Sequence, residues 1–150
     1  MLAWRICREG QQRLDGEGAR LHGGRWNSEG IAVVYASSTL ALAALECLVH
    51  VDVEDVPRDL VAMALRAPDD AEETLVAVER LPADWRRVPD HPVCARIGDE
   101  WVRKGAALRL RVPSAVVPEE SNLLINPGHP RWREVVVESV RRFGFDPRLL

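Results

Sequence analysis

A single carboxylate interrupts an otherwise apolar stretch of this chain. From Leu40 to Val49 every residue except Glu46 is apolar. The stretch predicts a helix that ends near His50 and that is buried, because a helix apolar on all sides has no face for water. Glutamate is almost never fully buried without a partner, since burying its charge costs free energy. We therefore expect Glu46 to face a pocket or a partner.

The segment before this helix supplies other parts of a candidate site. Arg25 follows two glycines, which let a backbone approach a ligand closely, and a guanidinium forks onto phosphate oxygens. A short strand then carries Tyr35, the only tyrosine of the chain. Residue type alone leaves other interpretations open. Arg25 suits a surface turn in which it pairs with Glu29, Tyr35 suits an exposed strand end, and Glu46 suits a buried pair with an arginine.

Length and composition limit the class of protein. A chain of 150 residues is expected to form one domain, residues 1–150. The net charge of −3 argues against nucleic-acid binding, which usually needs a basic surface. The three cysteines include no Cys-x-x-Cys pair and predict no disulfide framework. With neither a signal peptide nor a membrane-spanning apolar run, a cytoplasmic protein without membrane contact is expected.

The hydrophobic pattern predicts the α+β class, with a mixed β-sheet and two or three helices. Strands are expected at residues 2–6, 31–36, 60–65, 75–78, 108–112 and 135–140, and helices at 38–50 and 94–104. Ser37 or Ser38 is expected to cap the first helix. Residues 11–24 are rich in glycine and charge, and predict a loop that closes over a ligand. Apolar residues alternate with arginines at 108–112, which predicts a half-buried strand.

The motifs of this chain, taken in order, resemble those of the RES domain family. They are Gly24-Arg25-Trp26-Asn27, Tyr35, Glu46, Val112-Pro113-Ser114 and Asn122-Leu123-Leu124-Ile125-Asn126-Pro127-Gly128-His129-Pro130, between an opening Trp4-Arg5-Ile6 and a closing Phe145-Asp146-Pro147-Arg148-Leu149. The resemblance covers essentially the whole chain. It implies a bacterial toxin of a type II toxin–antitoxin system, with an ADP-ribosyltransferase-like fold that consumes NAD.

The resemblance also implies roles for four catalytic residues. Glu46 is expected to stabilise the positive charge that builds on the ribose as the nicotinamide–ribose bond breaks. Arg25 is expected to bind the pyrophosphate of NAD, and Tyr35 is expected to stack against its nicotinamide. Ser114 is expected to bind the nicotinamide amide or a ribose, and its Pro-Ser context favours it over Ser121 as the family's serine. From residue type alone, Ser114 suits a turn cap better.

Further contacts to NAD are expected from Arg5, Trp26, Asn27 and Asn122. Trp26 suits stacking on a ring of NAD and equally suits the core, while Asn27 suits a role in holding its turn. Should Arg25 not bind the phosphates, Arg5 and the arginines of strand 108–112 are the next candidates.

Two histidine motifs favour structure over chemistry. His129 lies in a rigid Asn-Pro-Gly-His-Pro turn and suits a cap better than an acid or base. His91 and Cys94 have a metal-like spacing, but no further ligands are evident and no metal is expected.

The expected activity is NAD degradation by a glycohydrolase or a phosphorylase, with NAD as substrate. The alternatives are an ADP-ribosyltransferase that modifies a cellular protein, and a binding module without catalysis. An RNA-cleaving toxin is disfavoured by the negative charge. Residue types do not separate water, phosphate and protein as acceptors. The expected partner is a cognate Xre-like antitoxin, and formation of a homodimer stays open because no interface is evident.

Overall fold

One seven-stranded sheet runs through the computed structural model, which describes all 150 residues. Its strand order is β4-β5-β6-β2-β1-β3-β7. The strands are β1 (Leu2–Arg8), β2 (Val34–Ser37), β3 (Leu60–Arg66), β4 (Glu73–Leu75), β5 (Arg109–Pro113), β6 (Ser121–Ile125) and β7 (Val136–Arg142). The α-helices are α1 (Glu17–His22), α2 (Leu40–Leu48) and α3 (Pro92–Lys104). Short 3-10 helices lie at Glu9–Gln11, Val78–Arg80, Pro130–Glu134 and Pro147–Leu149.

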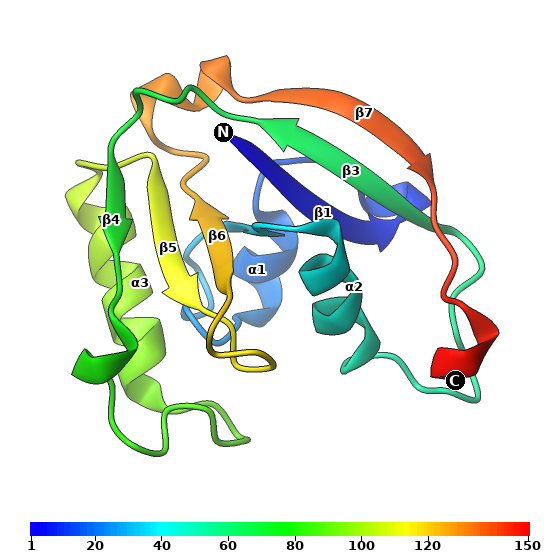
Figure 1. Cartoon of the computed structure of the whole chain (residues 1–150). Coiled ribbons are helices and arrows are strands. Elements are labelled where there is room, and N and C mark those ends of the chain that lie inside the picture. Colours follow the sequence, from blue (N-terminus) through cyan, green and yellow to red (C-terminus); the bar gives the residue numbers. More distant parts are fainter.

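The sheet is mixed, because β4 and β5 are parallel while all other pairs are antiparallel. In Figure 1, β4, β5 and β6 stand upright on the left, and β1, β3 and β7 cross the top of the view. Helix α3 lies beside the upright strands and α2 lies below β1. This arrangement confirms the expected α+β class.

Each face of the sheet has its own hydrophobic cluster. Residues of strand β2 alternate between them, since successive side chains of a strand point to opposite faces. Val34 and Ala36 belong to a cluster that includes Met63, whereas Tyr35 packs against a second cluster that includes Trp101 of α3. The second cluster fixes α3, and with it the turn that carries Arg25, against the sheet.

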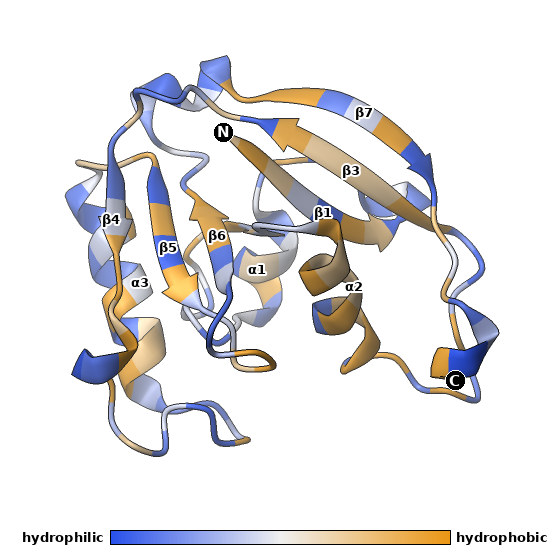
Figure 2. Ribbon diagram, in the orientation of Figure 1, coloured by the Kyte–Doolittle hydropathy of each residue, from blue (hydrophilic) through white to orange (hydrophobic).

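Helix α2 differs from its prediction in its cap and its burial. Thr39 caps it, accepting a hydrogen bond from the Leu42 backbone N–H at 3.1 Å, so the expected caps Ser37 and Ser38 were wrong. Only Leu42 and Ala43 are buried, and Val49 is 57% exposed. The helix packs on β1 and β2 through one side, so its outer side is apolar without being covered. Figure 2 shows α2 in mostly hydrophobic colours.

The stretch expected to be a loop at 11–24 contains the short helix α1. Gly16 precedes α1 with a φ of +69°, and a Cβ there would lie 2.7 Å from the Val33 backbone nitrogen. Glycine therefore permits both the left-handed backbone and the close approach to the chain before β2. The hydrophobic periodicity of the sequence did not predict α1, because the helix has only six residues and none of them is buried.

Three expected strands differ in detail. The strand placed at 31–36 is β2 at Val34–Ser37, so residues 31–33 lie outside it. The strand placed at 75–78 is β4 at Glu73–Leu75, and Val78 begins a 3-10 helix. Strand β5 is not half-buried, because Arg109 on its supposed outer face is only 5% exposed. Arg109 binds Glu73 at 3.0 Å and the carbonyls of Pro68 and Ala71 at 2.6 and 3.0 Å. These partners compensate the buried charge.

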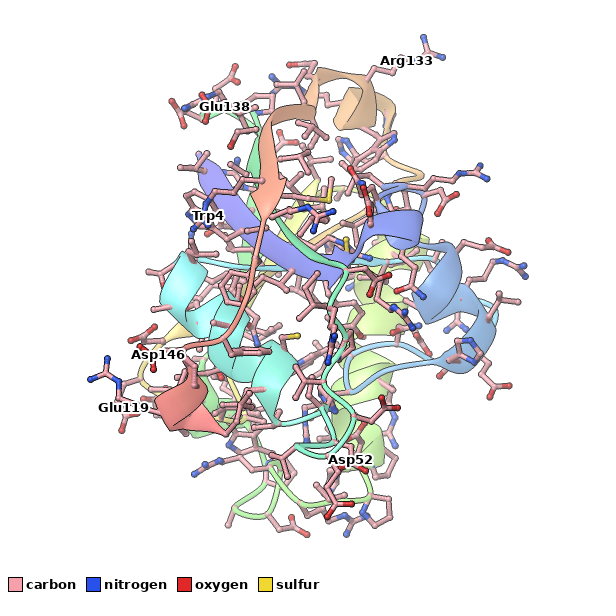
Figure 3. The ribbon with its side chains drawn as sticks, turned by 90° about the vertical axis from the view of Figure 1, so that its right-hand side faces the viewer. Trp4, Asp52, Glu119, Arg133, Glu138 and Asp146 are labelled. Carbon is pink, nitrogen blue, oxygen red and sulfur yellow. The ribbon has the colours of Figure 1, made fainter.

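The opposite edge of the sheet is formed by β7, all of whose residues are exposed. Figure 3 shows Glu138 and Arg133 pointing outward at one end of the molecule and Asp52 at the other. Glu138 pairs with Arg66 of β3 at 2.6 Å, and charged side chains on an edge strand discourage pairing with other chains. None of the helices has the length and apolar character needed to span a membrane.

Helix α3 packs so closely against the Arg25 turn that one added methyl group is expected to destabilise the fold. A Cβ on Gly98 of α3 would lie 1.7 Å from the Trp26 carbonyl oxygen. Gly98→Ala should therefore lower the free energy of unfolding by about 3 kcal/mol, since overpacking against backbone forces shifts. Gly18→Ala in α1, where a Cβ meets nothing within 4 Å, should instead be neutral or stabilise by under about 1 kcal/mol. Urea unfolding of both variants measures the contrast, and equal stabilities would contradict the packing described here.

Candidate functional site

Glu46 is held by two neutral hydrogen-bond donors. Its Oε1 atom accepts from Ser114 Oγ at 2.6 Å and from Asn122 Nδ2 at 2.6 Å. The side chain is half-buried, and its Oε2 atom accepts no hydrogen bond from the protein. The interpretation of Glu46 as one half of a structural pair with an arginine is wrong, because neither donor carries a charge. The arrangement fixes an anionic group and leaves one of its oxygens available.

Ser114 supports Glu46 and has no capacity left for a ligand. It is 0% exposed, donates its proton to Glu46, and accepts the backbone N–H groups of Val116 and Val117 at 3.0 Å each. A hydroxyl offers one donor and two acceptor sites, and all are in use. The expected hydrogen bond from Ser114 to NAD therefore has no free atom here. Ser121 takes no part in this network, which favours Ser114 over Ser121 as the serine of the family motif.

Asn122 is oriented by a residue that sequence reasoning assigned to a helix cap. Ser37 Oγ donates to Asn122 Oδ1 at 2.8 Å, which directs the amide N–H group toward Glu46. The two residues are direct partners in the β2–β6 register. The alternation along β2 places Ser37 on the same face as Tyr35, and this was the signal in the sequence that could have identified Ser37.

Tyr35 anchors the turn that carries Arg25. Its hydroxyl donates to Asn27 Oδ1 at 2.6 Å and accepts from the Trp26 backbone N–H at 3.1 Å. A Cβ on Gly24 would lie 2.8 Å from that hydroxyl, which explains the glycine there. Burial raises the pKa of Tyr35 well above its ordinary value, although its bond with Trp26 opposes the shift. Tyr35 therefore stays neutral at physiological pH.

Trp26 and Asn27 lie inside the protein. Both are 2% exposed, and the Trp26 ring lies 6.1 Å from that of Trp85. The Asn27 amide donates to the carbonyls of Ala19 and Ile31 at 2.8 and 3.0 Å. In this conformation both side chains hold the turn together and neither presents a surface to a ligand, so stacking of NAD on Trp26 stays a prediction without support from the geometry.

Helix α3 fixes the same turn from the other side. Asp99 is 5% exposed and accepts the backbone N–H of Ser28 at 2.9 Å and its hydroxyl at 2.6 Å. Sequence reasoning missed Asp99, because it lies 71 positions from Ser28 and resembles any polar residue of an amphipathic helix.

Arg25 is bound to the segment that precedes α3. Its Nη1 donates to the Trp85 carbonyl at 2.8 Å, and its Nη2 lies 3.1 Å from Asp90. Longer contacts reach the carbonyls of Arg86 and Arg87 at 3.4 and 3.3 Å. The expected alternative partner, Glu29, takes no part. Only 16% of the Arg25 side chain is exposed.

The other arginines considered for phosphate binding are placed differently. Arg5 lies on the sheet face opposite to Ser37, because Ser37 is in register with the neighbouring Trp4. It makes a long contact of 3.4 Å with the Tyr35 carbonyl, and its Nε is buried without a partner. Arg111, like Arg109, is bound to Glu73. The structure brings none of the three to Glu46.

His129 caps the 3-10 helix at Pro130–Glu134, and His91 caps α3. His129 Nδ1 accepts the Arg131 backbone N–H at 3.1 Å, and His91 Nδ1 accepts that of Val93 at 3.1 Å, so the capping interpretation of His129 is confirmed. Cys94 is buried, and burial raises the pKa of its thiol although nearby Arg25 acts in the opposite direction. No group of three or more His, Cys, Asp or Glu side chains is arranged to hold a metal ion.

The Glu46 group and the Arg25 turn meet at strand β2. Tyr35 supports the turn and Ser37 orients Asn122, and both point to one face of the sheet. Two surface hollows lie elsewhere, one of about 220 Å³ beside α3 and β4 and one of about 390 Å³ at residues 127–133. Neither is lined by Glu46 or Arg25. The candidate site is therefore defined by its hydrogen bonds rather than by these hollows.

Comparison with known proteins gives consistent matches over most of the chain. The model of the RES domain matches residues 2–146. A protein of Sphingobium sp. (strain YBL2) named Prs ADP-ribosylating toxin is 37% identical, over 98% of this chain and 95% of that protein. Toxin Res of Yersinia enterocolitica is 38% identical, over 89% of this chain and 88% of its own length.

The fold also matches a solved structure. The crystal structure of the M. tuberculosis MbcT–MbcA toxin–antitoxin complex contains a chain that superposes with a TM-score of 0.77, over 95% of this chain and 83% of the other, at 17% identity. At that identity the likeness concerns the fold alone.

The contacts of Ser114 predict which of the two candidate serines matters for stability. Ser114→Ala leaves two part-buried backbone N–H groups without their acceptor and removes one of the two donors to Glu46, so it should lower the free energy of unfolding by about 1–3 kcal/mol. Ser121→Ala removes no side-chain hydrogen bond and should change it by less than about 0.5 kcal/mol. Urea unfolding distinguishes them, and a larger loss in Ser121→Ala would refute the assignment.

Proposed function

This chain belongs to the RES domain family, and from that membership and the geometry at Glu46 we propose that it is an NAD-consuming toxin of a toxin–antitoxin system. The proposed reaction cleaves the nicotinamide–ribose bond, with water or phosphate as acceptor. The observation that carries the proposal is the half-buried Glu46 carboxylate, whose Oε1 atom is fixed by two neutral donors while Oε2 has no protein partner. Few structural roles require that arrangement.

The chemistry needs such a carboxylate. Departure of nicotinamide leaves oxocarbenium-like positive charge on the ribose, and a preorganised anion stabilises that charge as it develops. Oε2 would face the ribose and its hydroxyls. Ser114 and Asn122 act through Glu46 as positioning residues, because neutral donors hold the carboxylate without neutralising it as an arginine would. Asn122 supports Glu46 through one amide N–H, and the expected contact with NAD through its second N–H stays part of the proposal.

Arg25 is proposed to bind the pyrophosphate, and the turn at 24–28 is proposed to present it. The turn is held by Tyr35 from β2 and by Asp99 from α3, which fixes the guanidinium relative to the sheet. Stacking of Tyr35 against the nicotinamide stays part of the proposal, through its ring rather than its occupied hydroxyl.

A second candidate function is transfer of the ADP-ribosyl group to a protein. It is favoured by the relative named Prs ADP-ribosylating toxin, at 37% identity. Both functions share the bond-breaking step at Glu46, so they differ only in the acceptor. Product analysis separates them: hydrolysis gives ADP-ribose, phosphorolysis gives its phosphorylated form, and transfer gives a protein that carries label from radioactive NAD.

Replacing Glu46 tests the shared step. Glu46→Gln keeps the shape and both donors but removes the charge, and it should reduce nicotinamide release from NAD by about 10²–10³-fold, the usual effect of losing a preorganised electrostatic group. Glu119→Gln, on the exposed loop before β6, is the matched control and should keep full activity. Circular dichroism checks that both variants fold. Wild-type NAD consumption by Glu46→Gln would exclude the mechanism.

An antitoxin partner is proposed because the fold match is to a chain of a toxin–antitoxin complex. A C-terminal carboxylate or an acidic side chain of that partner would take the place of the pyrophosphate at Arg25. Co-expression with the product of the adjacent gene, purification of the complex and titration with NAD should show that nicotinamide release is lost. A stable complex that turns over NAD at the full rate would contradict occlusion of the site.

A further inference from the structure

Two of the contacts of Arg25, those with Trp85 and Asp90, differ in how firmly the partner is held. Trp85, whose carbonyl holds Nη1, is 4% exposed and packed in the core. Asp90, which holds Nη2, is 45% exposed. Between them residues 86–90 form an exposed strap, because all five are exposed. The carboxylate is therefore able to move away from Arg25 without disturbing the anchor at Trp85.

The strap touches both parts of the candidate site. Arg25 contacts the carbonyls of Arg86 and Arg87 at the start of the strap and the carboxylate of Asp90 at its end. Its contact with the Trp85 carbonyl lies just before the strap. In addition, Arg86 Nε donates to the carbonyl of Ala115 at 2.8 Å. Ala115 follows Ser114, which holds Glu46. The strap thus runs from the guanidinium proposed for the pyrophosphate toward the turn that supports the carboxylate.

Asp90 also provides the negative charge that a ligand phosphate would bring. The Nε atom of Arg25 donates to no protein oxygen, whereas Nη2 makes a long contact with the Arg86 carbonyl and the guanidinium lies near the Cys94 thiol. The edge formed by Nε and Nη2 is the one able to receive two phosphate oxygens side by side. Asp90 occupies the Nη2 half of that edge. A pyrophosphate placed there together with Asp90 would bring like charges together, which is unfavourable.

From this arrangement we infer that Asp90 is an internal competitor for the pyrophosphate of the ligand, displaced from Arg25 with the strap when NAD binds. The inference rests on the proposed function. Its consequence is selectivity: a ligand that carries a pyrophosphate replaces the carboxylate at Arg25, whereas a nucleoside without phosphate gains nothing by displacing it.

The test measures binding apart from turnover. In full-length protein that carries Glu46→Gln, calorimetry would give dissociation constants for NAD, ADP-ribose and nicotinamide riboside. Asp90→Asn should tighten NAD and ADP-ribose by about 3–10-fold, the scale of a partly exposed ion pair, and leave nicotinamide riboside unchanged. Arg25→Lys should weaken NAD and ADP-ribose, because lysine lacks the planar fork.

Asp84→Asn is the matched control. Asp84 precedes the strap and pairs with Arg87 at 3.2 Å and with His91 at 3.5 Å, without touching Arg25, so its variant should bind all three ligands as the parent does. Thermal melting checks that each variant folds. Unchanged or weaker binding of ADP-ribose by Asp90→Asn would overturn the competitor role, as would equal tightening of nicotinamide riboside. If neither NAD nor ADP-ribose binds the parent or any variant, the proposed function itself fails, and the inference fails with it.

Discussion

The two hydrogen bonds that converge on Glu46 Oε1 join three separate parts of the chain. They connect α2 to the end of β5 through Ser114 and to β6 through Asn122. Because both donors are neutral, they fix the position of the carboxylate without placing a compensating positive charge beside it, which suits electrostatic stabilisation of a developing cation. The sheet order β5-β6-β2 makes this possible, since it brings Ser37 to Asn122 and Tyr35 to the Arg25 turn on one face.

The Arg25 turn shows how a surface feature can depend on buried partners. Tyr35, Asn27 and Asp99 are all committed to hydrogen bonds that hold it, and Gly98 allows α3 to approach the Trp26 carbonyl. These four residues therefore determine one guanidinium position. In such a network, the position of the ligand-binding group depends on residues that do not touch the ligand. Removing any of these residues costs free energy, because its hydrogen-bond partner is left buried and unsatisfied.

Sequence patterns predicted the α+β class and the main helices, while the role of Glu46 in catalysis stays a prediction. They succeeded where the signal was local, as in the strands of alternating and β-branched residues. They failed where the decisive contact was distant. The hydroxyls at 37, 38 and 39 are interchangeable as caps in sequence, and only the register with Asn122 shows why Ser37 is used elsewhere. Likewise, Ser114 was identified as a ligand contact, because sequence cannot show that its donor and acceptor sites are all in use within the protein.

The convergence on Glu46 also bears on how such a gene would decay. If the protein burdens its host, selection favours any substitution that silences it, and most of these need not touch the reacting atoms. Changes at Ser37, Asn122 or Ser114 would each remove one hydrogen bond of the network around Glu46, and none of the three residues belongs to a hydrophobic cluster. Degenerate copies of the gene that are changed at these supporting positions would then encode proteins that still fold.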